Sequence, residues 1–93
     1  MTFRDVANLI DNFLAKRITF KKFEDDFLAI YLNEYEKFTE EEQDFMDNIN
    51  EKTEYTSGKV TEEERNYDWI THDEFQKWLE DYKQKNIKFW KGQ

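Results

Sequence analysis

The sequence predicts an all-α fold, an antiparallel four-helix bundle with an irregular segment before the last helix. The chain has no proline and only two glycines, which suits helices and disfavours turn-rich sandwiches and barrels. Four segments carry apolar residues at the three- and four-residue spacing of a helix face. Aromatic residues make up 18% of the chain, which favours a packed core over disorder although 39% of the residues are charged. A length of 93 residues fits one domain, 1–93.

The first two helices are expected over residues 2–15 and 19–36. In the first, apolar residues from Phe3 onward share one face, and Thr2 with Asp5 fits an N-terminal cap. In the second, the apolar arc is wide enough to predict packing against more than one neighbour. The positions that widen it are Leu28, Leu32 and Tyr35. The link between the helices is short, so they should run antiparallel.

The third helix is expected to begin after Thr39, whose capping box is completed by Glu42. Its apolar face is narrow. The opposite face should carry carboxylates within a stripe about 80° wide. These carboxylates are Glu40, Asp44, Asp47, Glu51 and Glu54. Like charges at helical spacing repel each other, so this helix should depend on tertiary packing or on a positively charged partner.

Residues 56–70 lack a regular pattern. A turn is expected at Ser57-Gly58, and a short helical turn after Thr61, which has Glu64 at the capping-box spacing. The last helix should open at Thr71, and its inner face should extend to Trp90 with one polar interruption at Asn86.

Charge is distributed unevenly along the chain. Residues 34–74 hold fifteen acids and four bases, whereas the whole chain has a net charge of −8. This could be no more than a solvated surface that keeps the protein soluble. It also disfavours direct binding to nucleic acid or to an anionic membrane and favours a basic partner. Because no stretch approaches the roughly 20 apolar residues of a membrane span and no export signal is evident, we expect a cytoplasmic protein.

The residue inventory argues against an enzyme. There are no cysteines, and Ser57 and His72 are the only serine and histidine, so they would be the only candidate nucleophile and base. His72 follows a helix cap and is expected at the surface. No glycine-rich phosphate loop and no EF-hand pattern fits the sequence. We therefore expect no catalytic residue, no metal and no cofactor.

With an enzyme disfavoured, the sequence is best interpreted as that of a protein that binds another protein. Acidic side chains at helical spacing, continued at residues 62–64, resemble the charge layout of a phosphate backbone and could occupy a basic groove. Aromatic residues in the irregular segment could supply anchors, or could instead close the end of the bundle. The candidate partner-binding residues are Asp44, Asp47, Glu51, Glu54, Tyr55, Glu62, Glu63, Glu64, Tyr67, Asp68 and Trp69.

Two short motifs add a family resemblance. Residues 13–23 contain Phe-Leu-Ala, two residues, Ile-Thr, three residues and Phe, and this stretch resembles the first hairpin of the colicin D immunity protein family. Arg65 followed by Asn66-Tyr67-Asp68 resembles that family's Arg and Asn-Tyr-acid stretch before the last helix. The resemblance covers both ends of the chain. It implies a four-helix immunity protein, as in colicin systems and contact-dependent growth inhibition.

The resemblance also implies a mechanism and a partner. Such a protein binds a tRNA-cleaving nuclease toxin, expected here one-to-one, and covers its active site with acids that stand in for tRNA phosphates. Glu62 matches the family's loop acid, and Asp47, Glu51 and Glu54 are candidates for its helix acid. The free protein is expected to be a monomer. An acidic helical adaptor for an unrelated basic protein is the alternative, and a carboxylate-based hydrolase is a third.

Overall fold

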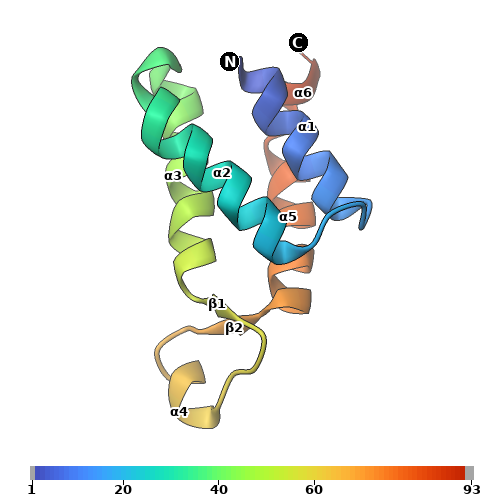
Figure 1. Ribbon diagram of the computed structural model, residues 1–93, viewed down its shortest axis with the longest axis vertical. Coiled ribbons are helices and arrows are strands. Elements are labelled where there is room, and N and C mark those ends of the chain that lie inside the picture. Colours follow the sequence, from blue (N-terminus) through green and yellow to red (C-terminus); the bar gives the residue numbers. More distant parts are fainter. Residues whose placement is uncertain (1, 92–93) are drawn as a thin grey trace.

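The computed structural model describes residues 2–91, which form an antiparallel bundle of four long helices (Figure 1). These are α1 (Phe3–Leu14), α2 (Phe20–Glu34), α3 (Glu40–Glu54) and α5 (His72–Lys85). Consecutive long helices run in opposite directions, and α1 and α2 lie in front of α3 and α5 in the view of Figure 1. The predicted all-α bundle is confirmed.

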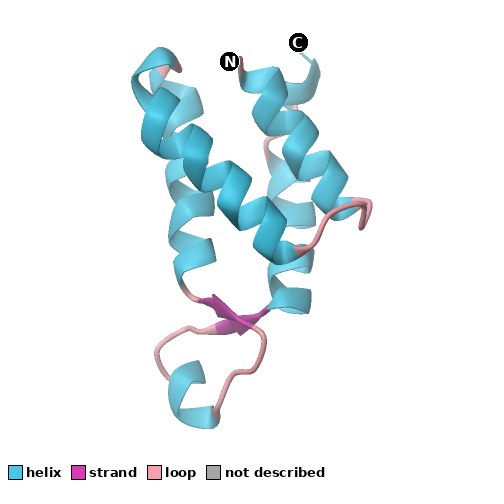
Figure 2. Ribbon diagram, in the orientation of Figure 1, coloured by secondary structure: helices cyan, strands magenta, loops and turns pink. Residues whose placement is uncertain are grey.

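Short elements connect and close the bundle (Figure 2). They are the 3₁₀ helix η1 (Tyr35–Lys37), strand β1 (Thr56–Ser57), helix α4 (Glu62–Arg65), strand β2 (Ile70–Thr71) and helix α6 (Lys88–Lys91). Residues 58–69, called the excursion below, leave the bundle after β1, carry α4 and return at β2. Among residues 2–91 no helix combines the length and the apolar character that a bilayer crossing requires.

The two strands form a parallel pair that the sequence did not predict. Thr56 lies opposite Ile70 and Ser57 opposite Thr71, and the Ile70 N–H donates to the Tyr55 carbonyl at 2.9 Å. Strands of two residues are too short to show the alternation that identifies a strand in a sequence. Their pairing holds the two ends of the excursion together beneath the bundle.

The predicted capping boxes are present. The Glu42 N–H donates to the Thr39 hydroxyl at 3.2 Å, and the Thr39 N–H donates back to the Glu42 carboxylate at 2.8 Å. The same reciprocal pair starts α4 at Thr61 and α5 at Thr71. Each box satisfies amides that the first turn of a helix leaves without partners.

The core is built mainly from phenylalanine. One aromatic cluster joins α1, α2 and α5 around Phe23 and Phe75, and another joins α1, α3 and α6 around Phe3 and Phe45. The buried apolar residues are Phe3, Val6, Ala7, Ile10, Phe13, Phe20, Phe23, Phe27, Ile30, Phe38, Phe45, Met46, Ile49, Phe75 and Leu79. Because every long helix contributes to this cluster, the four helices share one core.

Two of the residues expected to widen the apolar face of α2 are exposed instead. Leu28 is 39% and Leu32 is 69% exposed, and only Tyr35 of that set is half-buried. Each leucine follows a core-packed residue, Phe27 or Tyr31, and so points about 100° away from it around the helix. Helix α2 still packs against both α1 and α3, but it does so through its phenylalanine face.

The last predicted helix is divided into two. Helix α5 ends at Lys85 because Asn86 leaves the helical conformation, with φ −123° and ψ 28°. The Asn86 side-chain amide donates to the Tyr82 carbonyl at 2.9 Å, which satisfies an acceptor at the helix end. Helix α6 then turns so that Phe89 stacks on Phe3 at 5.0 Å, at the end of the bundle where α1 begins.

Candidate functional site

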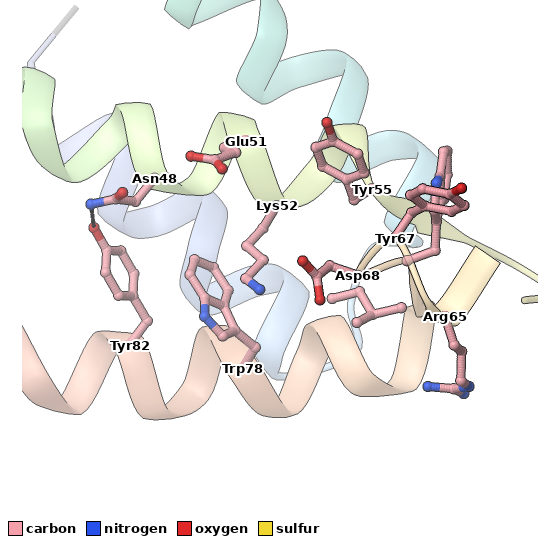
Figure 3. Close-up of a pocket in the computed structure, with 11 residues that line it drawn as sticks. Asn48, Glu51, Lys52, Tyr55, Arg65, Tyr67, Asp68, Trp78 and Tyr82 are labelled. Carbon is pink, nitrogen blue, oxygen red and sulfur yellow. Dashed lines mark hydrogen bonds between the residues drawn. The ribbon is translucent and has the colours of Figure 1, made fainter. Parts of the chain in front are cut away.

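An open groove of about 730 Å³ lies where α3, α5 and the excursion meet (Figure 3). We call it the aromatic groove, because five of its lining side chains are tyrosine or tryptophan. Helix α3 contributes Asn48, Glu51 and Lys52 to it, together with Tyr55, which caps the end of the helix. The excursion and β2 contribute Arg65, Tyr67, Asp68, Trp69 and Ile70, and α5 contributes Trp78 and Tyr82.

The wall formed by α5 is rigidly attached to α3. Trp78 stacks on Tyr82, one helical turn away, with ring centroids 4.7 Å apart. The Tyr82 hydroxyl donates to the Phe45 carbonyl at 2.9 Å and accepts from the Asn48 amide at 3.2 Å. These bonds hold the Tyr82 ring against α3, and Trp78 packs on that ring.

The opposite wall is more exposed. The Tyr55 and Trp69 rings meet edge to face at 5.6 Å, and the backbone N–H of Trp69 donates to the Glu64 carbonyl at 3.2 Å. Tyr55 is 42% exposed and Tyr67 is 69% exposed. Large rings left this open to solvent are available to bury against a partner.

The backbone of the excursion is shaped by Asp68, whose φ of 69° lies in the left-handed region. Aspartate tolerates this region better than most non-glycine residues. Arg65 anchors the same stretch to the start of α5 through an ion pair with Glu74 at 3.0 Å. The bend and the anchor together place Asp68 and its aromatic neighbours at the mouth of the groove (Figure 3).

Of the four charged residues that line the groove, Arg65 is paired with Glu74 and the other three form no ion pair among the residues that the structure describes. Within residues 2–91, Glu51, Lys52 and Asp68 have no oppositely charged group within 4.0 Å. The Lys52 ammonium lies 5.7 Å from the centre of the Trp78 ring. The site thus combines aromatic faces, two free carboxylates and one loosely held cation.

No family model, curated protein or solved structure matches this chain.

Five of the residues predicted to bind a partner meet in this groove. They are Glu51, Tyr55, Tyr67, Asp68 and Trp69. The sequence left open whether the aromatic members anchor a partner or close the end of the bundle. Trp69 is half-buried beside Tyr55, while Tyr67 is largely exposed, so the structure leaves both roles available.

Asp47 is turned toward α2 and away from the groove. Its two carboxylate oxygens accept hydrogen bonds from the Tyr31 hydroxyl at 2.7 Å and the Tyr35 hydroxyl at 3.1 Å. Burial and this hydrogen bond raise the pKa of Tyr31 to about 12. The carboxylate of Asp47 thus joins α2 to α3. Glu54, the last acid of the predicted stripe, is exposed and accepts a hydrogen bond from the Asn50 side-chain amide at 3.4 Å.

The remaining predicted residues lie in other places. Asp44 lines a smaller hollow of about 230 Å³ with Glu41 and Lys88, next to the groove. Glu62, Glu63 and Glu64 are the first three residues of α4, at the end of the excursion farthest from the bundle, and the Glu64 carboxylate accepts from the Thr61 N–H in the capping box. The predicted stripe is therefore divided among surfaces, because α3 packs against α2 on one side and α5 on the other.

The sequence interpretation missed several residues of the groove. Trp78 and Tyr82 fall on the inner face that the sequence predicts for the last helix, and in the structure they are half-buried rather than enclosed. Lys52 and Asn48 were not singled out. Their spacing of four residues, with Tyr55 three further on, places all three on one side of α3 and was the available signal. Ile70 was also missed, and Arg65 was named in the family motif but not among the candidate partner-binding residues.

His72 and the carboxylates are the residues of this chain that could serve an enzyme as a base or as metal ligands. His72 is exposed, as predicted, and its ring stacks on Phe20 at 4.5 Å. Over the part of the chain that the structure describes, no group of three or more His, Asp or Glu side chains is placed to hold a metal ion.

The Arg65–Glu74 pair makes a testable contribution to acid stability. The hydrogen bond from Arg65, followed by the Thr71 amide, lowers the pKa of Glu74 from 4.5 to about 2. A lowered folded-state pKa stabilises the protein above the unfolded value, and this contribution is lost as the pH falls through the folded value. We expect wild type to exceed Glu74→Gln in free energy of unfolding at pH 7, and the difference to shrink from pH 4.5 to pH 2.

Glutamine can still complete the capping box, so this comparison isolates the charge. Urea unfolding at a series of pH values measures the difference. A difference that stayed constant from pH 7 to pH 2 would contradict the assignment.

Proposed function

We propose that this chain is an immunity protein that binds a tRNA-cleaving nuclease toxin and neutralises it by covering its basic active site. The observation that carries the proposal is the aromatic groove, in which the free carboxylates of Glu51 and Asp68 stand among exposed aromatic rings. Nine of the eleven residues that line the groove lie in residues 34–74, a segment with an excess of eleven negative charges. The resemblance of residues 13–23 and 65–68 to the colicin D immunity family gives the class of partner.

Each part of the groove has a role in such binding. The surrounding negative charge attracts and orients a cationic active site before contact. Exposed tyrosine and tryptophan side chains then supply desolvated anchor contacts, which dominate the binding energy of most protein interfaces. Glu51 and Asp68 take the places that tRNA phosphates would occupy.

The test is a tRNA cleavage assay with the toxin domain encoded beside the gene for this chain. Cleavage is measured with and without one equivalent of the purified protein. Loss of cleavage at one equivalent supports the proposal. Undiminished cleavage refutes it and favours the acidic adaptor, for which a pull-down would recover a basic protein unrelated to nucleases.

The association rate should depend strongly on salt. Charges at the rim of an interface act chiefly on the rate of encounter. Raising the ionic strength from 0.01 M to 0.15 M shortens the distance over which such charges act from about 30 Å to about 8 Å. We expect the association rate constant to fall by at least about tenfold over this range, with a much smaller change in the dissociation rate constant. Stopped-flow tryptophan fluorescence measures both. An association rate that is insensitive to salt would contradict electrostatic steering.

A further inference from the structure

The side chain of Lys52 occupies the aromatic groove. Figure 3 shows it leaving α3 and ending between Trp78 and Asp68. Its ammonium is 5.7 Å from the centre of the Trp78 ring and has no carboxylate within 4.0 Å among residues 2–91. The groove therefore already holds a cation, which lies over the Trp78 ring and forms no ion pair among residues 2–91.

Lysine satisfies such a site incompletely. The electron-rich face of tryptophan attracts a cation, but an ammonium is a compact, strongly hydrated charge on a flexible stem. It covers little of the ring area and leaves both groove carboxylates without a partner. A planar guanidinium can stack on an aromatic face and also donate a pair of hydrogen bonds to a carboxylate.

We propose that the aromatic groove is a receptor site for one arginine side chain of the bound partner, and that Lys52 is a resident cation which this arginine displaces. The partner's identity rests on the proposed function, but the arginine preference belongs to the groove itself. The incoming guanidinium would lie over Trp78 and pair with Glu51 or Asp68.

Charge and volume both favour this occupant. With Arg65 already paired to Glu74, the unpaired groups of the groove are Glu51, Asp68 and Lys52, so departure of Lys52 leaves two negative charges. A volume of about 730 Å³ leaves room for a long side chain beside the rings. A neutral occupant of the same shape would leave those carboxylates unpaired, and an acidic one would be repelled.

The three tryptophans provide a direct readout without any partner protein. Trp69 and Trp78 line the groove, whereas the Trp90 indole N–H donates to Asp11 at 3.2 Å in the half-buried packing of α6. Each indole N–H gives one resonance in a ¹⁵N–¹H correlation spectrum. The probes are N-acetylarginine methylamide, the lysine analogue and the citrulline analogue, a neutral isostere of arginine.

We expect the arginine probe to shift the Trp69 and Trp78 resonances saturably while Trp90 stays in place. The lysine probe should bind at least about threefold more weakly, and the citrulline probe should give no saturable shift. Equal shifts from arginine and citrulline, or equal shifts at all three tryptophans, would overturn the proposal.

The displacement of Lys52 is tested by substitution. Lys52→Gln should tighten binding of the arginine probe by at least about threefold, because the resident cation is gone. Lys77→Gln is the matched control, since Lys77 is an exposed lysine on α5 outside the groove and its loss changes the net charge equally. Identical tightening in both variants would overturn a specific role for Lys52. An unchanged Trp90 resonance verifies that each variant is folded.

This test and the nuclease assay fail independently. A groove that does not prefer arginine, in a protein that still protects tRNA, refutes the receptor site and leaves the proposed function standing. A groove that prefers arginine, in a protein that does not protect tRNA, upholds the receptor site and refutes the nuclease as partner.

Discussion

Reversing the charge at Glu51 is expected to weaken inhibition of the nuclease by at least about 30-fold. Glu51 lies on the α3 side of the aromatic groove and has no ion pair among residues 2–91, so its carboxylate is free for a cationic group of the partner. Breaking a desolvated charge pair across an interface typically costs about 2 kcal/mol or more, which corresponds to that factor. Titrating Glu51→Lys against a fixed amount of toxin domain in the tRNA cleavage assay measures it.

Glu54 offers a matched control on the same helix. Glu54→Lys makes the same change of charge one turn away, at an exposed residue that does not line the groove. We expect this variant to lose less than about threefold, through long-range electrostatics alone. Equal losses in the two variants would mean that net charge, rather than the groove, governs inhibition. Circular dichroism should show the same helicity in both.

Removing the ring of Phe75 is expected to destabilise the protein by about 3–5 kcal/mol, the usual range for truncating a buried aromatic residue. Phe75 is fully buried and its ring contacts those of Phe13, Phe20 and Phe23, at centroid distances of 5.2–5.8 Å. It therefore joins α5 to both α1 and α2. Urea unfolding of Phe75→Ala, followed by circular dichroism, measures the loss.

The control for this prediction is Leu32→Ala. Leu32 is 69% exposed, so its truncation should change the free energy of unfolding by less than about 0.5 kcal/mol. A large loss at Leu32 would show that α2 packs through a face which the structure places in solvent. A small loss at Phe75 would contradict the shared aromatic core.

The fold could be predicted because its signals are local. Capping boxes at Thr39, Thr61 and Thr71 place the starts of three helices within a residue, and the phenylalanine spacing identifies the buried face of α2. The two features that the sequence did not predict are the break in the last helix and the pairing of the two strands. Helix α5 ends before Asn86, whose side-chain amide donates to the Tyr82 carbonyl, and the strand pair requires residues fourteen apart to meet.

The candidate site could be predicted only in part, for a related reason. A helical wheel locates carboxylates around α3 but not the neighbours that α2 and α5 bring to each side of it. Asp47 and Glu51 are four residues apart, yet one accepts from two tyrosines of α2 and η1 while the other faces the groove. The spacing of Trp78 and Tyr82 places them on the inner face of α5, but it does not show that their rings are only half-buried.

The parallel pairing of β1 and β2 fixes the two points at which the excursion leaves and rejoins the bundle. Since Thr56 and Ile70 are held against each other, the chain between them is a closed loop whose ends do not move when its length changes. The entropy of closing such a loop grows only logarithmically, so doubling its length adds about 0.6 kcal/mol. Insertions near α4 can thus remodel one wall of the groove while the four helices keep their packing, which would allow recognition to diverge faster than the fold.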